Sequence, residues 1–214
     1  DAVIHSASIV AMWGKWDDFY KTNVIGTQNV IDACLLNKVP HLLYTSSPSV
    51  VFGNESLENI DESQDYPNES FSLYGKSKAI AEKRVLKING ARLKTVALRP
   101  HLIFGKGDQN LLPRVIEKAK RGRLKIVGRG ENLVDVLYVE NAAIAHVQAL
   151  SEMIKNDSVC GRAYFLGQER PVVLWDFING FLTELKIPPV TKKISSKFAF
   201  KLGLLFEKIY GFLG

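Results

Sequence analysis

"HLLYTSS", residues 41–47, is an apolar run that ends in small hydroxyl side chains. Such a run is typical of a buried parallel strand whose carboxyl end reaches a functional edge of a sheet. "DAVIHSAS" (1–8) has the same character, and "LKTVALRP" (93–100) is a further apolar run that closes with a proline. These three segments predict three parallel strands.

Helical segments separate the predicted strands. Between 16 and 37 apolar residues recur at helical spacing. Residues 54–70 are acidic and rich in Asn and Ser, which predicts a surface loop, and Ser70 or Ser72 can then cap a helix that ends near Gly90. The order strand, helix, strand, helix, strand predicts an α/β fold built on a Rossmann-like, doubly wound parallel sheet.

Composition agrees with a folded domain. Of the 214 residues, 46% are apolar and 23% are charged, which excludes a disordered or fibrous chain. We assign 1–105 to the C-terminal half of a dinucleotide-binding domain and 106–195 to a substrate region. Within that region we expect the helix at 139–155 to pack back on the sheet. An amphipathic helix is predicted over 196–214.

The segment "SLYGKSKAIAEK" (72–83) places Tyr74 and Lys78 four residues apart on a predicted helix. Chance alone predicts about 0.6 such pairs in a chain with this composition, so the spacing by itself is weak. A half-buried tyrosine beside a lysine that extends to solvent is the simpler interpretation of an isolated pair. The setting changes this, because Ser46 and Ser47 end the preceding strand, at the edge where open α/β sheets bind ligands.

Several motifs occur in order along the chain: "VIHSAS", "NVIGTQNVIDAC", "YTSSPSVVFG", "YGKSKAIAE", "ALRPHLIFGKGD" and "NLVDVLYVENAAIAHVQAL". Together they resemble the extended short-chain dehydrogenase/reductase family, and most closely its 3β-hydroxysteroid dehydrogenases and decarboxylating sterol-4-carboxylate 3-dehydrogenases. The resemblance implies an NAD(P)-dependent oxidoreductase of a secondary alcohol or ketone, with NAD the first choice of cofactor.

The resemblance also implies roles for individual residues. Tyr74 would be the proton acceptor, Lys78 would bind the nicotinamide ribose and tune Tyr74, and Ser47 would polarise the substrate oxygen, with Ser46 as the alternative. Asn23 would hold a water or a backbone group behind Lys78. The cofactor would be lined by His5, Ser6, Ala7, Pro100 and Ile103, together with Tyr74 and Lys78. No Cys, His or carboxylate spacing predicts a metal site.

Two positions favour an apolar, sterol-like substrate. Sugar-nucleotide relatives carry an Asn at the position of Leu102 and an Arg at that of Val134, and apolar side chains cannot donate those hydrogen bonds. A reductase of small carbonyl or flavonoid-like compounds shares every motif and stays an alternative, as does a sugar-nucleotide epimerase or dehydratase. A dinucleotide sensor without catalytic activity is the weakest alternative, because Tyr74 and Lys78 are both retained.

The Gly-rich phosphate turn of a dinucleotide fold is missing from the predicted first strand. "FGKGD" and "VGRGE" contain glycines but follow the third strand, so neither has the right setting. We therefore expect the chain to be a fragment that lacks about two or three strand–helix units, and to be inactive alone.

The charge of +6 and the last helix bear on partners. In the segment 197–213 lysines form a narrow stripe and apolar residues fill most of the remaining circumference, which predicts a helix lying on a membrane surface; burial against the substrate region is the alternative. The basic stretch "KAKRGRLK" (118–125) is a solvated helix end, and we expect no nucleic-acid partner. Two cysteines suit a reducing, cytoplasmic location. The predicted last helix adds peripheral membrane contact to this expectation. A homodimer is retained as a candidate assembly.

Overall fold

The computed structural model describes residues 1–11, 13–109 and 111–213; in its last helix, side chains are described only up to 203 and at 206. The chain divides into two compact units. Unit 1 comprises Asp1–Ile103 and Leu137–Gly167, and unit 2 comprises Phe104–Val136 and Gln168–Gly214.

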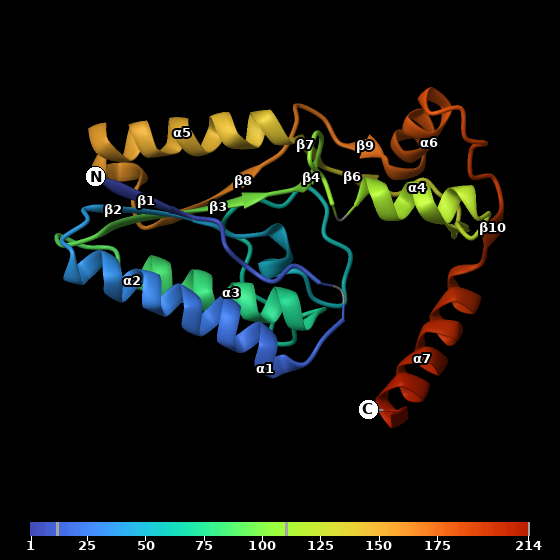
Figure 1. The fold of residues 1–214 in the computed structure, drawn as a ribbon, viewed down its shortest axis with the longest axis horizontal. Helices are drawn as coiled ribbons and strands as arrows, with labels where there is room; N and C mark the ends of the chain where they lie inside the picture. Colours follow the sequence, from blue (N-terminus) through green and yellow to red (C-terminus); the bar gives the residue numbers. More distant parts are fainter. Residues whose placement is uncertain (12, 110, 214) are drawn as a thin grey trace. The chain divides into compact units, whose positions relative to one another are not determined.

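Unit 1 is a parallel sheet covered by helices on both faces, with α2 and α3 on one face and α5 on the other (Figure 1). The strand order is β1-β2-β3-β8, and all three pairings are parallel. Its elements in chain order are β1 (Ala2–His5), α1 (Trp16–Phe19), η1 (Tyr20–Ile25), α2 (Gly26–Leu36), β2 (His41–Thr45), η2 (Pro48–Val51), α3 (Leu73–Lys87), β3 (Lys94–Pro100), α5 (Val139–Lys155), η3 (Asp157–Val159) and β8 (Arg162–Leu166). The chain passes between the units three times: within β4 (Leu102–Phe104), at the start of β7 (Val136–Tyr138) and between Gly167 and Gln168.

Strand β2 shows why both faces of the sheet must be covered. Successive side chains point to opposite faces, so Leu42 and Tyr44 join the cluster under α2 and α3, while Leu43 joins the cluster under α5. All three are buried. This pattern confirms the predicted Rossmann-like α/β fold.

Two features of unit 1 differ from the expectation. The helix predicted from 16 to 37 contains a π-helical segment, η1, between α1 and α2. The strand β8, which the sequence places in the substrate region, instead belongs to the main sheet, because Arg162–Leu166 pairs with β3 over five residues. The boundary between the units falls at 103 rather than at 105.

Unit 2 has its own small core. An apolar cluster of Ile126, Ile178, Leu182, Ile187 and Val190 packs against side chains of α4 and α6. Its elements are α4 (Leu112–Lys120), β5 (Ile126–Val127), β6 (Leu133–Val134), β9 (Val172–Val173), α6 (Leu174–Glu184), β10 (Lys193–Ile194) and α7 (Ser196–Leu213). The described part of α7 exposes Lys197, Phe198 and Lys201. The third lysine of the predicted stripe, Lys208, lies outside the described side chains, as do the predicted apolar positions Leu204, Leu205, Ile209 and Phe212. Within the described chain, every helix is too short or too polar to cross a membrane.

Candidate active site

The start of α3 brings the tyrosine motif against the end of β2. Ser72 caps the helix, and its hydroxyl accepts a hydrogen bond from the Gly75 backbone N–H at 3.0 Å. A Cβ at Gly75 would lie only 2.7 Å from the Ser49 carbonyl oxygen. Glycine at this position therefore lets the first turn of α3 lie directly on η2, and this contact places Tyr74 beside the turn that begins at Ser47.

Tyr74 is half-buried, and two effects act on the pKa of its phenol in opposite directions. Burial raises the pKa of its phenol, and a hydrogen bond with the Ser47 side chain acts in the opposite direction. The Ser47 Oγ also lies 2.8 Å from the Ser49 Oγ and accepts a hydrogen bond from the Ser49 backbone N–H. The Ser46 Oγ is buried and has no hydrogen-bond partner among the described residues. Of the two serines, Ser47 is the one that affects the pKa of the phenol, and its role as the first choice from the sequence stays a prediction.

Lys78 is 1% exposed and lies one helical turn after Tyr74. Its Nζ donates a hydrogen bond to the Thr45 carbonyl oxygen at 2.6 Å and lies 4.1 Å from the centre of the Tyr44 ring. Burial lowers the pKa of Lys78 to about 7, and the charge of Glu82 acts in the opposite direction. From the sequence we expected a direct effect of Lys78 on the acidity of Tyr74. The described contacts of the ammonium are with the Thr45 carbonyl and the Tyr44 ring, and its effect on Tyr74 stays a prediction.

The surroundings of Lys78 suit a polyhydroxylated ligand. An ammonium group has three N–H donors, and a buried donor needs a partner. Among the described residues Nζ has one hydrogen-bond acceptor, the Thr45 carbonyl. The remaining donors fit the hydroxyl groups of a nicotinamide ribose, which is the group that the sequence resemblance assigns to this lysine.

Asn23 is 1% exposed and belongs to the π-helical segment η1. Its Oδ1 accepts a hydrogen bond from the Ile9 N–H at 2.8 Å, and its Nδ2 donates to the Ile9 carbonyl at 3.1 Å and to the Ser77 Oγ at 2.9 Å. Ser77 in turn donates to the Tyr74 carbonyl at 2.8 Å. Asn23 therefore ties the segment after β1 to the helix that carries Tyr74 and Lys78, through backbone groups and Ser77.

His5 is also tied to this network. Its Nε2 lies 2.9 Å from the Thr27 Oγ1, and that hydroxyl donates its proton to the Asn23 carbonyl at 2.7 Å. Nε2 must consequently carry the proton in the bond to Thr27. Burial lowers the pKa of His5, and the charge of Lys78 adds to this effect, so the imidazole is neutral at pH 7.

The other predicted cofactor residues differ in exposure. Ser6 and Ala7 follow β1 and are exposed, whereas Pro100 is buried in β3 opposite Leu166. Ile103 is 38% exposed. β1, β2 and β3 are parallel, so Ser6, Ser47 and Pro100 all lie at the carboxyl edge of one sheet.

A buried ion pair that the sequence did not predict holds α3 against β3, two helical turns after Tyr74. Arg99 on β3 donates from Nε to both oxygens of Glu82 at 3.2 and 3.1 Å, and from Nη2 to Oε1 at 2.7 Å. The Tyr66 hydroxyl donates to the same carboxylate at 2.6 Å. This network joins α3, β3 and the loop at 54–70. A charged residue inside the apolar run "TVALRP" was the available signal.

The family is decided by a match over most of the chain. The model of the 3-beta hydroxysteroid dehydrogenase/isomerase family matches residues 1–195. The chain belongs to this family. The resemblance stated from the sequence is thereby confirmed.

Relatives in the family carry two kinds of name. A 2-alkyl-3-oxoalkanoate reductase of Stenotrophomonas maltophilia is 41% identical over 100% of this chain and 65% of its own length. A decarboxylating sterol-4-alpha-carboxylate 3-dehydrogenase of Schizosaccharomyces pombe is 37% identical over 99% of this chain and 63% of its own length. The solved structure of MoeE5 in complex with UDP-glucose and NAD is 26% identical, with a TM-score of 0.70 over 91% of this chain and 66% of MoeE5. The chain thus spans less than two thirds of these relatives' length in the two sequence matches.

No metal centre accompanies this family site in the described part of the chain, where no group of three or more His, Cys, Asp or Glu residues lies close enough to hold an ion. Leu102 and Val134, the two positions that favour an apolar substrate, lie in β4 and β6, and both side chains are half-buried.

Proposed function

We propose that this chain carries the catalytic edge of an NAD(P)-dependent oxidoreductase that interconverts a secondary alcohol and a ketone. The observation that supports this most directly is the placement of Tyr74 and buried Lys78 one helical turn apart at the start of α3, where Gly75 packs closely on the turn that follows Ser47. The names of the relatives, a reductase and a dehydrogenase, describe the two directions of such a reaction. The NAD bound to MoeE5 supports a nicotinamide cofactor.

The protein groups manage the oxygen of the substrate and its proton. In reduction, the Tyr74 hydroxyl donates a proton to the carbonyl oxygen as that oxygen becomes an alcohol, and the Ser47 hydroxyl holds the same oxygen by a hydrogen bond. In oxidation, Tyr74 takes the proton from the alcohol. The nicotinamide cofactor supplies or accepts the hydride when bound. A phenol whose pKa is raised is protonated at neutral pH, so the arrangement is ready for the reductive direction.

Lys78 stabilises the charge that this proton transfer creates. When Tyr74 has given up its proton, a cation one helical turn away favours the phenolate. Because the pKa of Lys78 is about 7, this lysine also exchanges protons readily at neutral pH. Its remaining N–H donors would hold the cofactor ribose, while Ser6 and Ala7 at the exposed end of β1 would lie along the cofactor.

The substrate class follows from what the names of the relatives share. A 2-alkyl-3-oxoalkanoate and a sterol-4-alpha-carboxylate oxidised at position 3 both place the reacting oxygen on the carbon next to the one that bears the carboxylate. Both also carry large apolar groups. We therefore propose a 3-hydroxy or 3-oxo carboxylic acid with apolar substituents. The two concrete candidates are a sterol acid, which adds a carboxylate to the sterol-like alcohol favoured from the sequence, and a 2-alkyl-3-oxo fatty acid.

A sugar nucleotide fits less well. The structural likeness to MoeE5 reports the shared fold, and Leu102 and Val134 lack the hydrogen-bond donors that grip a nucleotide diphosphate in sugar-nucleotide relatives.

Cofactor-dependent turnover of the two candidate acids by the full-length protein tests the proposal. We expect oxidation of NADH or NADPH with a 2-alkyl-3-oxo acid, or reduction of NAD or NADP with a 3β-hydroxysterol-4-carboxylate, and a loss of about 100-fold or more in kcat for Tyr74→Phe. Unchanged turnover in Tyr74→Phe would refute the role of the phenol. Turnover of UDP-glucose, with neither acid used, would refute the substrate class.

A further inference from the structure

The net positive charge of the chain belongs to unit 2. This unit holds 15 of the 28 Lys and Arg residues but only 8 of the 22 Asp and Glu residues, so its net charge is +7, while that of unit 1 is −1. A charge asymmetry of this size points to an anionic partner for unit 2.

The end of α4 presents part of this charge in a fixed geometry. The Arg123 N–H bonds to the Lys118 carbonyl at 2.9 Å and the Gly122 N–H bonds to the Ala119 carbonyl at 2.8 Å, with Gly122 at φ +62°. These bonds form a Schellman motif, which ends the helix and turns the chain sharply. Lys118 and Arg123 are therefore held on either side of one turn, and both are exposed.

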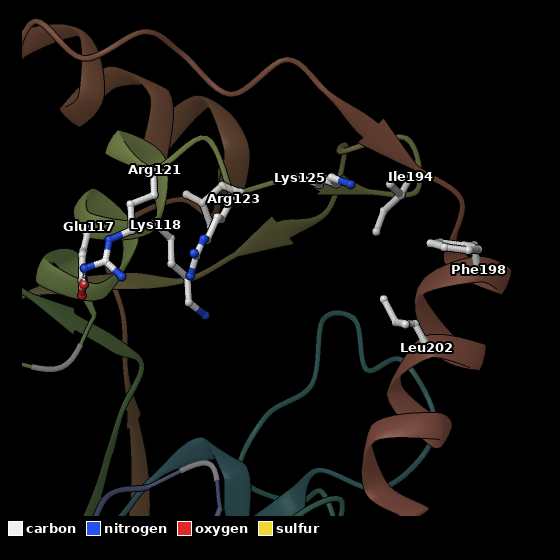
Figure 2. Close-up of a pocket in the computed structure, with 9 residues that line it drawn as sticks. Glu117, Lys118, Arg121, Arg123, Lys125, Ile194, Phe198 and Leu202 are labelled. Atoms are coloured by element: carbon white, nitrogen blue, oxygen red, sulfur yellow. Dashed lines mark ion pairs between the residues drawn. The ribbon is translucent and has the colours of Figure 1, made fainter. Parts of the chain in front are cut away.

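Helix α7 begins opposite these cations because its start is tied to β5. Ile194 of β10 pairs with Val127 of β5 in parallel register. Ser195 then caps α7 by accepting a hydrogen bond from the Phe198 N–H at 3.2 Å. Phe198 and Leu202 lie four residues apart, so they share a face of α7. Figure 2 shows both side chains directed into the space next to the α4 end.

The two segments line an open pocket of about 570 Å³. One side carries cationic groups and the other side is apolar; the lining residues are Glu117, Lys118, Arg121, Arg123, Leu124, Lys125, Ile194, Phe198 and Leu202. Glu117 pairs with Arg121 at 2.7 Å, which compensates one of the cations and leaves the excess on Lys118, Arg123 and Lys125. Phe198 is 56% exposed and Leu202 is 36% exposed.

We propose that this pocket seats the phosphate headgroup of an anionic phospholipid, with the apolar face of α7 lying among the acyl chains at the membrane surface. The cations match the phosphate, and the exposed apolar side chains match the acyl chains. A nucleic acid would use the cations but would leave aliphatic Leu202 and Ile194 without a complementary surface. The proposal is independent of the oxidoreductase activity.

Flotation of the full chain with vesicles tests the proposal. We expect binding to phosphatidylcholine vesicles that contain phosphatidylserine and much weaker binding to phosphatidylcholine alone. Raising the ionic strength from about 0.15 M to about 1 M shortens the Debye length from about 8 Å to about 3 Å and should weaken the binding. The triple variant Lys118→Gln, Arg123→Gln, Lys125→Gln should lose about fivefold in affinity for each cation, or roughly 100-fold in total.

A matched triple variant in unit 1, Lys15→Gln, Lys21→Gln, Lys87→Gln, removes the same charge from exposed positions and should retain vesicle binding. Phe198→Ser should lower the affinity for both vesicle types by about tenfold, because its side chain would no longer enter the interface.

Three outcomes would overturn the proposal. Equal losses in the two triple variants would assign the binding to overall charge. Binding of a labelled RNA or DNA duplex without vesicle binding would assign a nucleic-acid partner. Competition by soluble glycerol phosphate at the same concentration of phosphate groups as the vesicles would assign a small-anion site.

Discussion

Replacing Lys78 by methionine should flatten the pH dependence of stability between pH 7.5 and pH 9. The unfolded chain binds a proton at this lysine with a pKa of 10.5, whereas burial lowers the pKa in the folded chain to about 7. Within this window the unfolded state therefore binds more protons, and stability rises with pH. Where the unfolded state binds one more proton than the folded state, the free energy of unfolding rises by about 1.36 kcal/mol per pH unit. Lys78 should therefore raise the free energy of unfolding by about 2 kcal/mol from pH 7.5 to pH 9.

Urea unfolding of the wild type and of Lys78→Met across this range measures the effect. The two cysteines and the tyrosines are the same in both proteins, so their titration cancels in the difference. Lys87→Met, at the exposed end of the same helix, should keep the wild-type slope. If Lys78→Met also keeps the wild-type slope, burial does not lower the pKa of the Lys78 ammonium. The role proposed for a lysine that titrates near pH 7 in this site would then be wrong.

Three further substitutions test the supports of the site. Glu82→Gln should lower the free energy of unfolding by about 3–5 kcal/mol, because it leaves the buried Arg99 guanidinium without a counterion, and an urea midpoint close to that of the wild type would contradict this. Gly75→Ala should destabilise by about 1–3 kcal/mol and also lower kcat, because its Cβ would displace the first turn of α3 from Ser49; a more stable variant, as helix propensity alone predicts, would contradict the close contact. Ser47→Ala should lower kcat by about 100-fold while Ser46→Ala changes it far less, and the reverse order in steady-state kinetics would transfer the role to Ser46.

Local signals in the sequence were sufficient for most of unit 1. Apolar runs placed β1, β2 and β3 within a few residues, and Ser72 was one of two predicted caps for α3. The strand β8 was assigned to the wrong region because its membership depends on pairing with β3, more than 60 residues earlier in the chain. The π-helical segment escaped detection for a different reason, since its side chains remain compatible with the helical spacing on either side.

The site was predictable where it depends on side chains in a motif and unpredictable where it depends on the backbone. Tyr74, Lys78 and Ser47 could be named from the sequence. The acceptor that holds Lys78 could not, because it is the carbonyl of Thr45 and every residue has one. Gly75 was a signal of this close backbone contact in the sequence, because glycine is a poor helix former and yet stands in the first turn of α3.

Burial acts on both Tyr74 and Lys78, and a neighbouring group opposes it at each of them. Burial favours the uncharged form of both groups, since it raises the pKa of the phenol and lowers that of the amine. The Ser47 hydrogen bond and the Glu82 charge act the other way, toward phenolate and ammonium. A neutral phenol with a neutral amine carries the same net charge as a phenolate with an ammonium. Moving a proton between them therefore requires no change in the total charge of the buried site.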